Sequence, residues 1–173
     1  VQFLDSEFAE LTVTAAMEQN PFTLSAAETG MNSISVSVSP KSKTRTYYCG
    51  YALKSDFDKY ASTEEFIGSV RRKLSASALI AGVSFEEYLA TQLVQGDHPF
   101  EFTGLKPETD YVVYAVGWYA PGDLLTTVLV SAPATTLPDA SGEVTVTFEN
   151  VASDGFDVVC TPDAAIEKYY VYV

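Results

Sequence analysis

The stretch GLKPETDYVVYAVG, which spans 104–117, places Leu105, Pro107, Thr109 and Tyr111 at every second position. Alternate residues of an extended strand lie on the same face of a sheet. We therefore expect Leu105 to fill the core at the end of one strand and Tyr111 to begin the next strand with its ring buried. Pro107 presets the backbone of the turn between them. The segment predicts two strands joined by a tight corner, and therefore a β fold.

Two segments nearer the N-terminus have the same two-residue period. SISVSVSP at 33–40 places three aliphatic residues on one face, and Pro40 ends the strand or its pairing. TYYCGYAL at 46–53 places two tyrosines, a cysteine and a leucine on one face. Strand-like patterns return at 98–105 and at 124–132. The chain is therefore expected to be mainly β.

After the second of these strands the period changes to that of a helix. Ser62 with Glu65, and Ser84 with Glu87, have the spacing of capping boxes, in which each side chain binds a backbone N–H group of the other residue. Apolar residues follow each box at helical spacing: Phe66, Val70 and Leu74, then Phe85, Leu89 and Leu93. Gly96 is expected to end the second helix. The sequence predicts two helices inserted between strands, with apolar faces that must be buried against another surface.

The segment 144–173 can be laid on 22–51 without a gap, at one constant offset. The apolar phase of the two segments is preserved, with Phe156 on Ile34, Val158 on Val36, Cys160 on Val38, Pro162 on Pro40, Tyr169 on Tyr47, Tyr170 on Tyr48 and Val171 on Cys49. A shared pattern at a fixed offset indicates an internal repeat. The second copy stops after its third predicted strand, so we expect an incomplete module with an exposed edge and half a core.

The charge of the chain excludes some partners. Of its 173 residues, 23 are acidic and 10 are basic, so its formal net charge is -13. Nucleic-acid phosphates and anionic membranes repel such a surface. Solubility is one explanation of the charge, and weak cation binding by carboxylates is another, although no loop has the spacing of calcium ligands. No run of about 18 apolar residues predicts a transmembrane helix.

The pattern of Leu105, Pro107, Thr109 and Tyr111 resembles the E–F corner of fibronectin type III modules, in which the tyrosine hydroxyl bonds the backbone upstream. The resemblance implies an immunoglobulin-like β-sandwich. The chain departs from the family because it lacks the core tryptophan near the second strand and carries a helical pair after the third. With EEYLATQLVQGD before the corner, it looks like the repeated modules of secreted or lipid-anchored surface proteins of Bacteroidetes. This implies an exported, tandem-repeat protein at the cell surface or in the periplasm, lipid-anchored upstream.

On this basis the chain divides into an N-terminal segment or linker (1–20), a fibronectin type III-like module (21–138), a linker (139–143) and a partial second module (144–173). The first module contains the two-helix insertion at about 55–97. The chain begins without a methionine or a signal peptide, so an excised or mature segment is expected. Strand exchange between two chains is one way to cover the edge of the partial module.

The residues that could carry chemistry form no catalytic set in the sequence. A catalytic role for His98, the only histidine, would need a nucleophile and an orienting acid. Cys49 has no electropositive context, and Cys49 and Cys160 are expected to be buried thiols, with a disulfide as the other possibility. The basic run at 71–73 is interpreted as a solvated helix face, with contact to an acidic partner as the alternative. We expect no enzymatic activity, no metal site and no cofactor.

The segment GWYAPGD at 117–123 is the best candidate for binding. A loop at the end of a rigid sandwich faces solvent and often carries function. Alternation along the strand points Trp118 away from the sandwich core, so Trp118, Tyr119 and Asp123 are the candidate binding residues. An exposed Trp–Tyr pair could stack on a sugar or anchor a protein. The alternative is that Trp118 packs against the inserted helices.

The sequence therefore predicts a non-enzymatic structural or adhesive module, which acts as a spacer or binds a protein in a bacterial cell-surface repeat protein. The alternative function is a glycan-binding accessory module in polysaccharide capture, with Trp118 and Tyr119 as sugar-stacking residues. Exposure of Trp118 separates the two functions, because a ring buried beneath the helices cannot stack on a glycan.

Overall fold

The computed structural model describes residues 17–139, 142–163 and 171. The first sixteen residues and most of the predicted third strand of the second copy lie outside the described residues. The described chain is mainly β, with strands β1 to β10 and helices α1 to α3. Neighbouring strands in every sheet run antiparallel.

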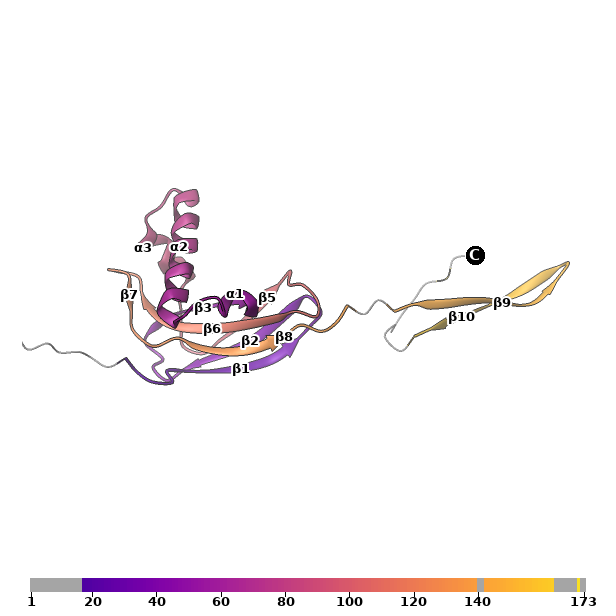
Figure 1. The fold of residues 1–173 in the computed structure, drawn as a ribbon, viewed down its shortest axis with the longest axis horizontal. Helices are drawn as coiled ribbons and strands as arrows, with labels where there is room; N and C mark the ends of the chain where they lie inside the picture. The colour runs from indigo at the N-terminus through magenta and orange to yellow at the C-terminus, as the bar shows by residue number, and fades with distance from the viewer. Residues whose placement is uncertain (1–16, 140–141, 164–170, 172–173) are drawn as a thin grey trace, which may run out of the picture.

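Two antiparallel sheets contain eight of the ten described strands (Figure 1). The first has the order β1-β2-β5 and consists of β1 (Phe22–Thr29), β2 (Ser33–Pro40) and β5 (His98–Thr103). The second has the order β4-β3-β6-β7, and β8 also pairs with β6; its strands are β4 (Val94–Gln95), β3 (Thr46–Leu53), β6 (Asp110–Tyr119), β7 (Leu124–Leu125) and β8 (Val130–Thr135). The strands predicted at 33–40 and 46–53 are confirmed with those bounds.

The two sheets share one hydrophobic core. Side chains that the alternation predicts to face inward are buried there: Ile34, Val36, Val38, Tyr47, Cys49, Leu105, Tyr111, Val113 and Ala115. Tyr51 has the same phase as Tyr47 but is exposed, and its ring lies against Phe102 with 4.9 Å between centroids. The prediction of which side chains face the core is therefore correct. Tyr51 lies on the same face as Tyr47 but further along the strand, where it is less deeply buried.

The predicted corner between β5 and β6 is formed by hydrogen bonds as well as by packing. Leu105 and Tyr111 are buried. The Lys106 N–H donates a 2.9 Å hydrogen bond to the Tyr111 hydroxyl. The side-chain amide of Asn32 donates to the Leu105 carbonyl at 2.8 Å, and the Leu105 N–H donates to the Asn32 carbonyl at 3.0 Å. These contacts tie the corner to the loop between β1 and β2.

Replacing Tyr111 by phenylalanine is expected to lower the free energy of unfolding by about 1–2 kcal/mol. The ring stays in the core, but the Lys106 N–H loses its acceptor. Urea denaturation followed by circular dichroism measures the change. The control is Tyr119→Phe, at an exposed tyrosine, where we expect a change within about 0.5 kcal/mol. Equal losses in the two variants would contradict the role of the Tyr111 hydroxyl.

The insertion forms three helices, one more than the sequence predicts: α1 (Lys54–Phe57), α2 (Thr63–Ala81) and α3 (Phe85–Gln92). Ser84 and Glu87 form the predicted reciprocal capping box at the start of α3. At the start of α2, the Ser62 hydroxyl accepts from the Glu65 N–H at 3.2 Å. The Glu65 carboxylate instead accepts from the Ala61 N–H at 3.1 Å. Both serines therefore cap their helices, and only the second box is reciprocal.

The predicted end of the second helix at Gly96 is wrong. Helix α3 ends at Gln92, because Leu93 has an extended backbone with φ -91 and ψ 142. Val94 then pairs with Tyr47 as part of β4. Hydrogen bonding to the free edge of β3 replaces the last helical turn. This is a tertiary effect, and the periodicity of the local sequence cannot predict it. Gly96, with φ 73, turns the chain from β4 toward β5.

The helices cover the outer face of the second sheet, and they create a second hydrophobic core (Figure 1). This explains why β6 is buried on both faces over 111–118. The second core contains residues of α2, α3 and β6, together with the residue after β6: Phe66, Ile67, Val70, Leu74, Leu89, Tyr114, Val116, Trp118 and Ala120. The predicted apolar helix faces are thus confirmed, and the sheet supplies their partner surface.

Strands β9 (Val144–Ala152) and β10 (Gly155–Pro162) form a separate two-stranded sheet (Figure 1). When the segment 144–173 is laid on 22–51, β10 spans the same positions as β2. In the same alignment β9 begins at the position where β1 begins. Three of the four strand boundaries thus agree with the internal repeat predicted from the apolar phase, and β9 ends one position beyond the equivalent of Thr29.

The two hairpins share their pairing register from the open end up to Val36 and Val158, and they differ nearer the turn, where Ser35 pairs with Glu28 but its equivalent Asp157 pairs with Glu149. Three pairs illustrate it: Val144 with Pro162 repeats Phe22 with Pro40, Val146 with Cys160 repeats Leu24 with Val38, and Phe148 with Val158 repeats Ala26 with Val36. Both hairpins close with the same hydrogen bond just beyond the strands. Asp163 N–H donates to the Glu143 carbonyl at 3.1 Å, as Lys41 N–H donates to the Pro21 carbonyl at 2.9 Å. The segment 143–163 thus repeats the hairpin 21–41 except close to its turn.

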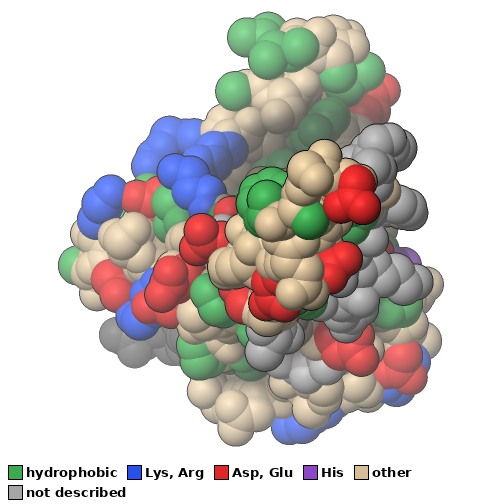
Figure 2. All heavy atoms as spheres, turned by 90° about the vertical axis from the view of Figure 1, so that its right-hand side faces the viewer, with side chains coloured by type: hydrophobic (Ala, Val, Ile, Leu, Met, Phe, Trp, Pro, Cys, Tyr) green, Lys and Arg blue, Asp and Glu red, His purple; other side chains and the backbone are tan. Residues whose placement is uncertain are grey.

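On the face shown in Figure 2, acidic side chains lie at several separate places rather than in one cluster. Within the described ranges, no group of three or more His, Cys, Asp or Glu side chains is arranged so that it could hold a metal ion. None of the helices in the described part of the chain is both long enough and apolar enough to cross a membrane.

Candidate functional site at the loop between β6 and β8

The loop predicted as the binding site begins at the end of β6 and turns at once. The Asp123 N–H donates to the Ala120 carbonyl at 3.0 Å, which closes the turn. Gly122 and Asp123 both have positive φ, at 75 and 53. Glycine adopts this conformation without strain, whereas aspartate does so at a cost that its side-chain contacts must offset. The loop is therefore held in one conformation by what Asp123 binds.

Trp118 is fully buried, so it is not available for the stacking role that the sequence suggested. Its indole Nε1–H donates a 2.8 Å hydrogen bond to Oδ1 of Asp123. Its ring meets Tyr48 and Phe85, each at 6.3 Å between centroids, and the Arg71 guanidinium lies 5.8 Å from the ring centroid. The alternative interpretation, in which Trp118 packs under the inserted helices, is confirmed.

Asp123 links the loop to helix α2. Its Oδ2 forms an ion pair with Nε of Arg71 at 3.0 Å, and Nη2 of Arg71 also donates to the Asp123 carbonyl at 3.3 Å. On the α3 side, the Gly122 N–H donates to Glu86 Oε1 at 3.0 Å. These contacts give Asp123 a structural role in the loop. Arg72 and Lys73 are exposed, as the solvated-face interpretation of the basic run predicts, whereas Arg71 is partly buried and pairs with Asp123.

Tyr119 is the one candidate residue of the three that faces solvent, with 51% of its surface exposed. It lines an open cleft of about 210 Å³ together with Thr44, Arg45, Thr46 and Thr126. The cleft offers an aromatic ring, a guanidinium group and three threonines. That combination can hold a polar ligand with a flat apolar face. The sequence did not point to Arg45 or the threonines, because they come from the loop before β3, from the first residue of β3 and from the return after β7.

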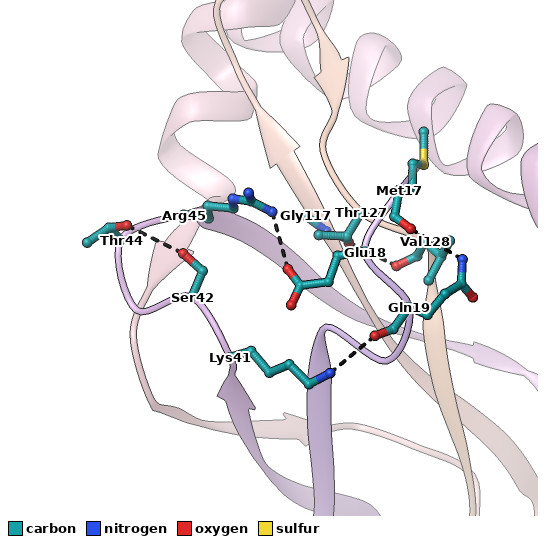
Figure 3. A network of polar contacts seen from close by, with 10 residues as sticks. All are labelled: Met17, Glu18, Gln19, Lys41, Ser42, Thr44, Arg45, Gly117, Thr127 and Val128. Atoms are coloured by element: carbon teal, nitrogen blue, oxygen red, sulfur yellow. Dashed lines mark hydrogen bonds and ion pairs between the residues drawn. The ribbon is translucent and has the colours of Figure 1, made fainter. Parts of the chain in front are cut away.

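The residues before β1 contact Arg45, one of the residues that line this cleft (Figure 3). Glu18 forms a parallel bridge with Thr127, and its Oε2 accepts from Nη1 of Arg45 at 3.3 Å. The Thr127 hydroxyl in turn accepts from the Gly117 N–H at 2.8 Å and donates to the Val128 carbonyl at 2.9 Å. The end of the predicted N-terminal linker is thus attached to the module near the cleft, and it orients the Arg45 guanidinium.

The other residues considered for chemistry are Cys49, Cys160 and His98. Burial raises the pKa of the Cys49 thiol to about 12, so the thiol is protonated at neutral pH and is a poor nucleophile. No disulfide joins Cys49 to Cys160, and Cys160 is only half-buried on β10. His98 is exposed, with its ring 4.6 Å from that of Phe100. Neither Cys49 nor His98 lies in the cleft beside Tyr119.

Comparison with known proteins adds no family to this picture. The chain matches no protein-family model, and it has no significant match among curated proteins. The geometry of the module, the repeated hairpin and the cleft is therefore the evidence for its function.

Proposed function

We propose that the chain is a non-enzymatic structural or adhesive module of an exported bacterial surface repeat protein, followed by part of a second module of the same kind. The observation that carries this proposal is the repeated hairpin, in which 143–163 repeats the strand starts, the pairing register up to Val158 and the closing hydrogen bond of 21–41. A chain that starts the same fold twice is built as an array, and arrays of rigid modules act as spacers or extended binding surfaces.

The proposed modules are of the fibronectin type III kind with a helical insertion. Support comes from the sheet orders, β1-β2-β5 against β4-β3-β6 with β8, and from a corner tyrosine that accepts a backbone hydrogen bond. The resemblance to lipid-anchored surface proteins of Bacteroidetes extends the proposal to location, which is the cell surface or the periplasm. The net charge of -13 suits a solvated, extended array.

Rigidity of the module supports the spacer role. The loop between β6 and β7, which is free in many sandwiches, is bound here to both long helices through Arg71 and Glu86. The helices are in turn seated on β6 by the second core. Because the insertion and the loop are bound to each other, this end of the module is rigid. An array of such modules therefore keeps a fixed distance between its ends.

Small-angle scattering of the full chain in dilute solution tests the spacer role. We expect a radius of gyration clearly above the value of about 16 Å for a compact chain of this length, because the second hairpin extends the first module instead of folding back on it. A radius at the compact value would contradict an end-to-end arrangement.

A carbohydrate-binding role is the second candidate, and the exposed Tyr119 beside Arg45 favours it. An aromatic ring next to hydrogen-bonding groups suits a sugar, whose apolar face stacks while its hydroxyls bind polar neighbours. Trp118 takes no part in this version of the site, because it is buried. The ligand would have to be held by one ring, the guanidinium and the threonines, which makes tight binding unexpected.

A glycan array followed by calorimetry separates the two candidates. The spacer role predicts no glycan retained by the full chain. If a glycan binds, Tyr119→Ala should weaken it at least about tenfold, consistent with the loss of one stacking ring. Leu124→Ala is the matched control, because Leu124 is exposed on neighbouring β7 and does not line the cleft. Glycan binding lost in the Tyr119 variant alone would replace the spacer proposal by the carbohydrate-binding one.

A further inference from the structure

The end of helix α2 carries two strongly exposed aliphatic side chains. Leu79 and Ile80 are 82% and 89% exposed, and Val83, in the turn that follows, is 44% exposed. We call these three residues the α2 tip. Helix α2 projects away from the strands, so the α2 tip lies at the outer end of the helix (Figure 1). Hydrophobic side chains cover that end in Figure 2. An exposed apolar group in such a position marks an interaction site.

Helix α2 does not need these side chains in order to end. Gly82 has φ 72, and its N–H donates to the Leu79 carbonyl at 3.2 Å. The Val83 N–H donates to the Ala78 carbonyl at 3.2 Å. These two backbone hydrogen bonds form a Schellman motif, which does not use the Leu79 or Ile80 side chain. A basic residue in the last turn would stabilise a solvated helix end, but α2 has none there.

The exposed side of α2 combines apolar and cationic residues. Residues 74–85 contain no Asp, Glu, Lys or Arg. Arg72 precedes Leu79 by seven residues, and Lys73 precedes Ile80 by the same number. Seven residues are close to two helical turns, so each cation lies on the same side of α2 as its aliphatic residue, about 10 Å back along the axis. Both cations are exposed, and neither forms an ion pair with a described residue.

The acidic residues that follow the α2 tip are held by other contacts. Glu86 accepts from the Gly122 N–H at 3.0 Å, which places it at the loop between β6 and β7. Glu87 accepts from the Ser84 N–H at 2.9 Å in the capping box of α3. At physiological salt, charges separated by more than about 8 Å are largely screened. A surface that touches the α2 tip therefore meets mainly the charges of α2 and the start of α3, and not the net charge of -13.

The size and shape of the α2 tip do not suit a second copy of the chain. Three side chains cover far less than the area of about 800 Å² that each partner buries in a specific protein interface. The clefts beside Tyr119 and Ser37 contain a charged side chain each, Arg45 and Glu101, so neither suits an aliphatic pair. A lipid bilayer needs no complementary groove, because its interior adapts to the apolar side chains that enter it.

We propose that the α2 tip inserts into the surface of a phospholipid bilayer, with Arg72 and Lys73 bound to lipid phosphates. The headgroup layer on each side of a bilayer is about 5–8 Å thick. When Leu79 and Ile80 reach the hydrocarbon boundary, the long side chains of the two cations extend into the headgroup layer from about 10 Å back. The observation that carries the inference is this match between the spacing on α2 and the layers of a bilayer. The inference does not depend on the proposed function.

The expected contact is weak. The three apolar side chains together contain fewer carbon atoms than a myristoyl chain, which by itself gives only marginal and reversible binding. The two cations strengthen the contact on a bilayer that contains anionic lipid. We expect half of the protein to be bound at about 1 mM accessible lipid. Such a contact orients a module that is already held near a membrane, and it does not retain a free module.

Co-sedimentation of the full chain with sucrose-loaded vesicles tests the inference. The vesicles contain phosphatidylcholine with phosphatidylglycerol at about one third, in about 150 mM salt. The lipid concentration is varied up to about 10 mM. Leu79→Ser with Ile80→Ser should weaken binding at least about tenfold, and Arg72→Gln with Lys73→Gln at least about threefold. All four side chains are exposed, so circular dichroism should show both variants unfolding at the wild-type temperature.

The matched control is Phe148→Ser with Phe156→Ser, which removes two exposed aromatic side chains from the second hairpin. Its vesicle binding should equal that of the wild type. Binding that is lost in this control but kept in the Leu79 and Ile80 variant would overturn the inference, and so would a wild type that stays unbound at about 10 mM lipid. Equal binding of the wild type and the Arg72 and Lys73 variant would contradict the phosphate contacts.

Discussion

Replacing Trp118 by alanine is expected to lower the free energy of unfolding by about 3–5 kcal/mol. Trp118 lies on β6 and is fully buried beneath the inserted helices. Its removal leaves a cavity the size of an indole ring. Asp123 also loses the 2.8 Å hydrogen bond from the indole, while its ion pair with Arg71 remains. Urea denaturation followed by far-ultraviolet circular dichroism measures the change, since the variant has no tryptophan to report by fluorescence.

The neighbouring residue provides the control. Tyr119→Ala changes the next aromatic side chain along β6, which is exposed, and we expect a loss below about 1 kcal/mol. If the Trp118 variant lost no more stability than the Tyr119 variant, Trp118 could not be a core residue, and the sugar-stacking interpretation of Trp118 would return.

Replacing Ile34 by alanine should cost about 2–5 kcal/mol of the unfolding free energy of the sandwich. Ile34 is fully buried on β2. Its repeat equivalent, Phe156, carries a larger side chain but lies on the bare face of the hairpin. Phe156→Ala should therefore change the main unfolding transition by less than about 0.5 kcal/mol, measured by the same denaturation in dilute protein.

This pair of variants compares two positions that the sequence treats as equivalent. A large loss from Phe156→Ala in the monomer would mean that the hairpin is covered within its own chain. A small loss from Ile34→Ala would mean that the core of the first sandwich is loosely packed at β2. Either result would contradict the burial described for the two hairpins.

Much of the fold could be predicted from the sequence, because the relevant information is local. The strands at 33–40 and 46–53 follow from alternation, and the helix starts at Ser62 and Ser84 follow from capping residues. The repeated hairpin follows from apolar phase, and strand pairing reproduces its register up to Val36 and Val158. In each case a residue and its near neighbours carry the whole signal.

The candidate site could be predicted only in part. Alternation correctly points Trp118 away from the sandwich core, yet it cannot say whether helices or solvent lie on that side. Arg71 illustrates the same limit, since its ion pair with Asp123 joins residues that only the folded chain brings together. The end of α3 is a third case, where pairing with β3 replaces the helical turn that Gly96 would have ended.

The sequence by itself determined the periods, the caps, the corner at Tyr111 and the existence of a second copy of the hairpin, because these depend on the backbone and on neighbours a few positions away. Only the tertiary structure decided which apolar faces are covered. It buried Trp118 beneath the insertion, left Tyr119 beside Arg45 at a cleft, and left the face of Phe148 and Phe156 bare. The physical reason is that burial depends on which surfaces meet, and such contacts join residues far apart in the chain.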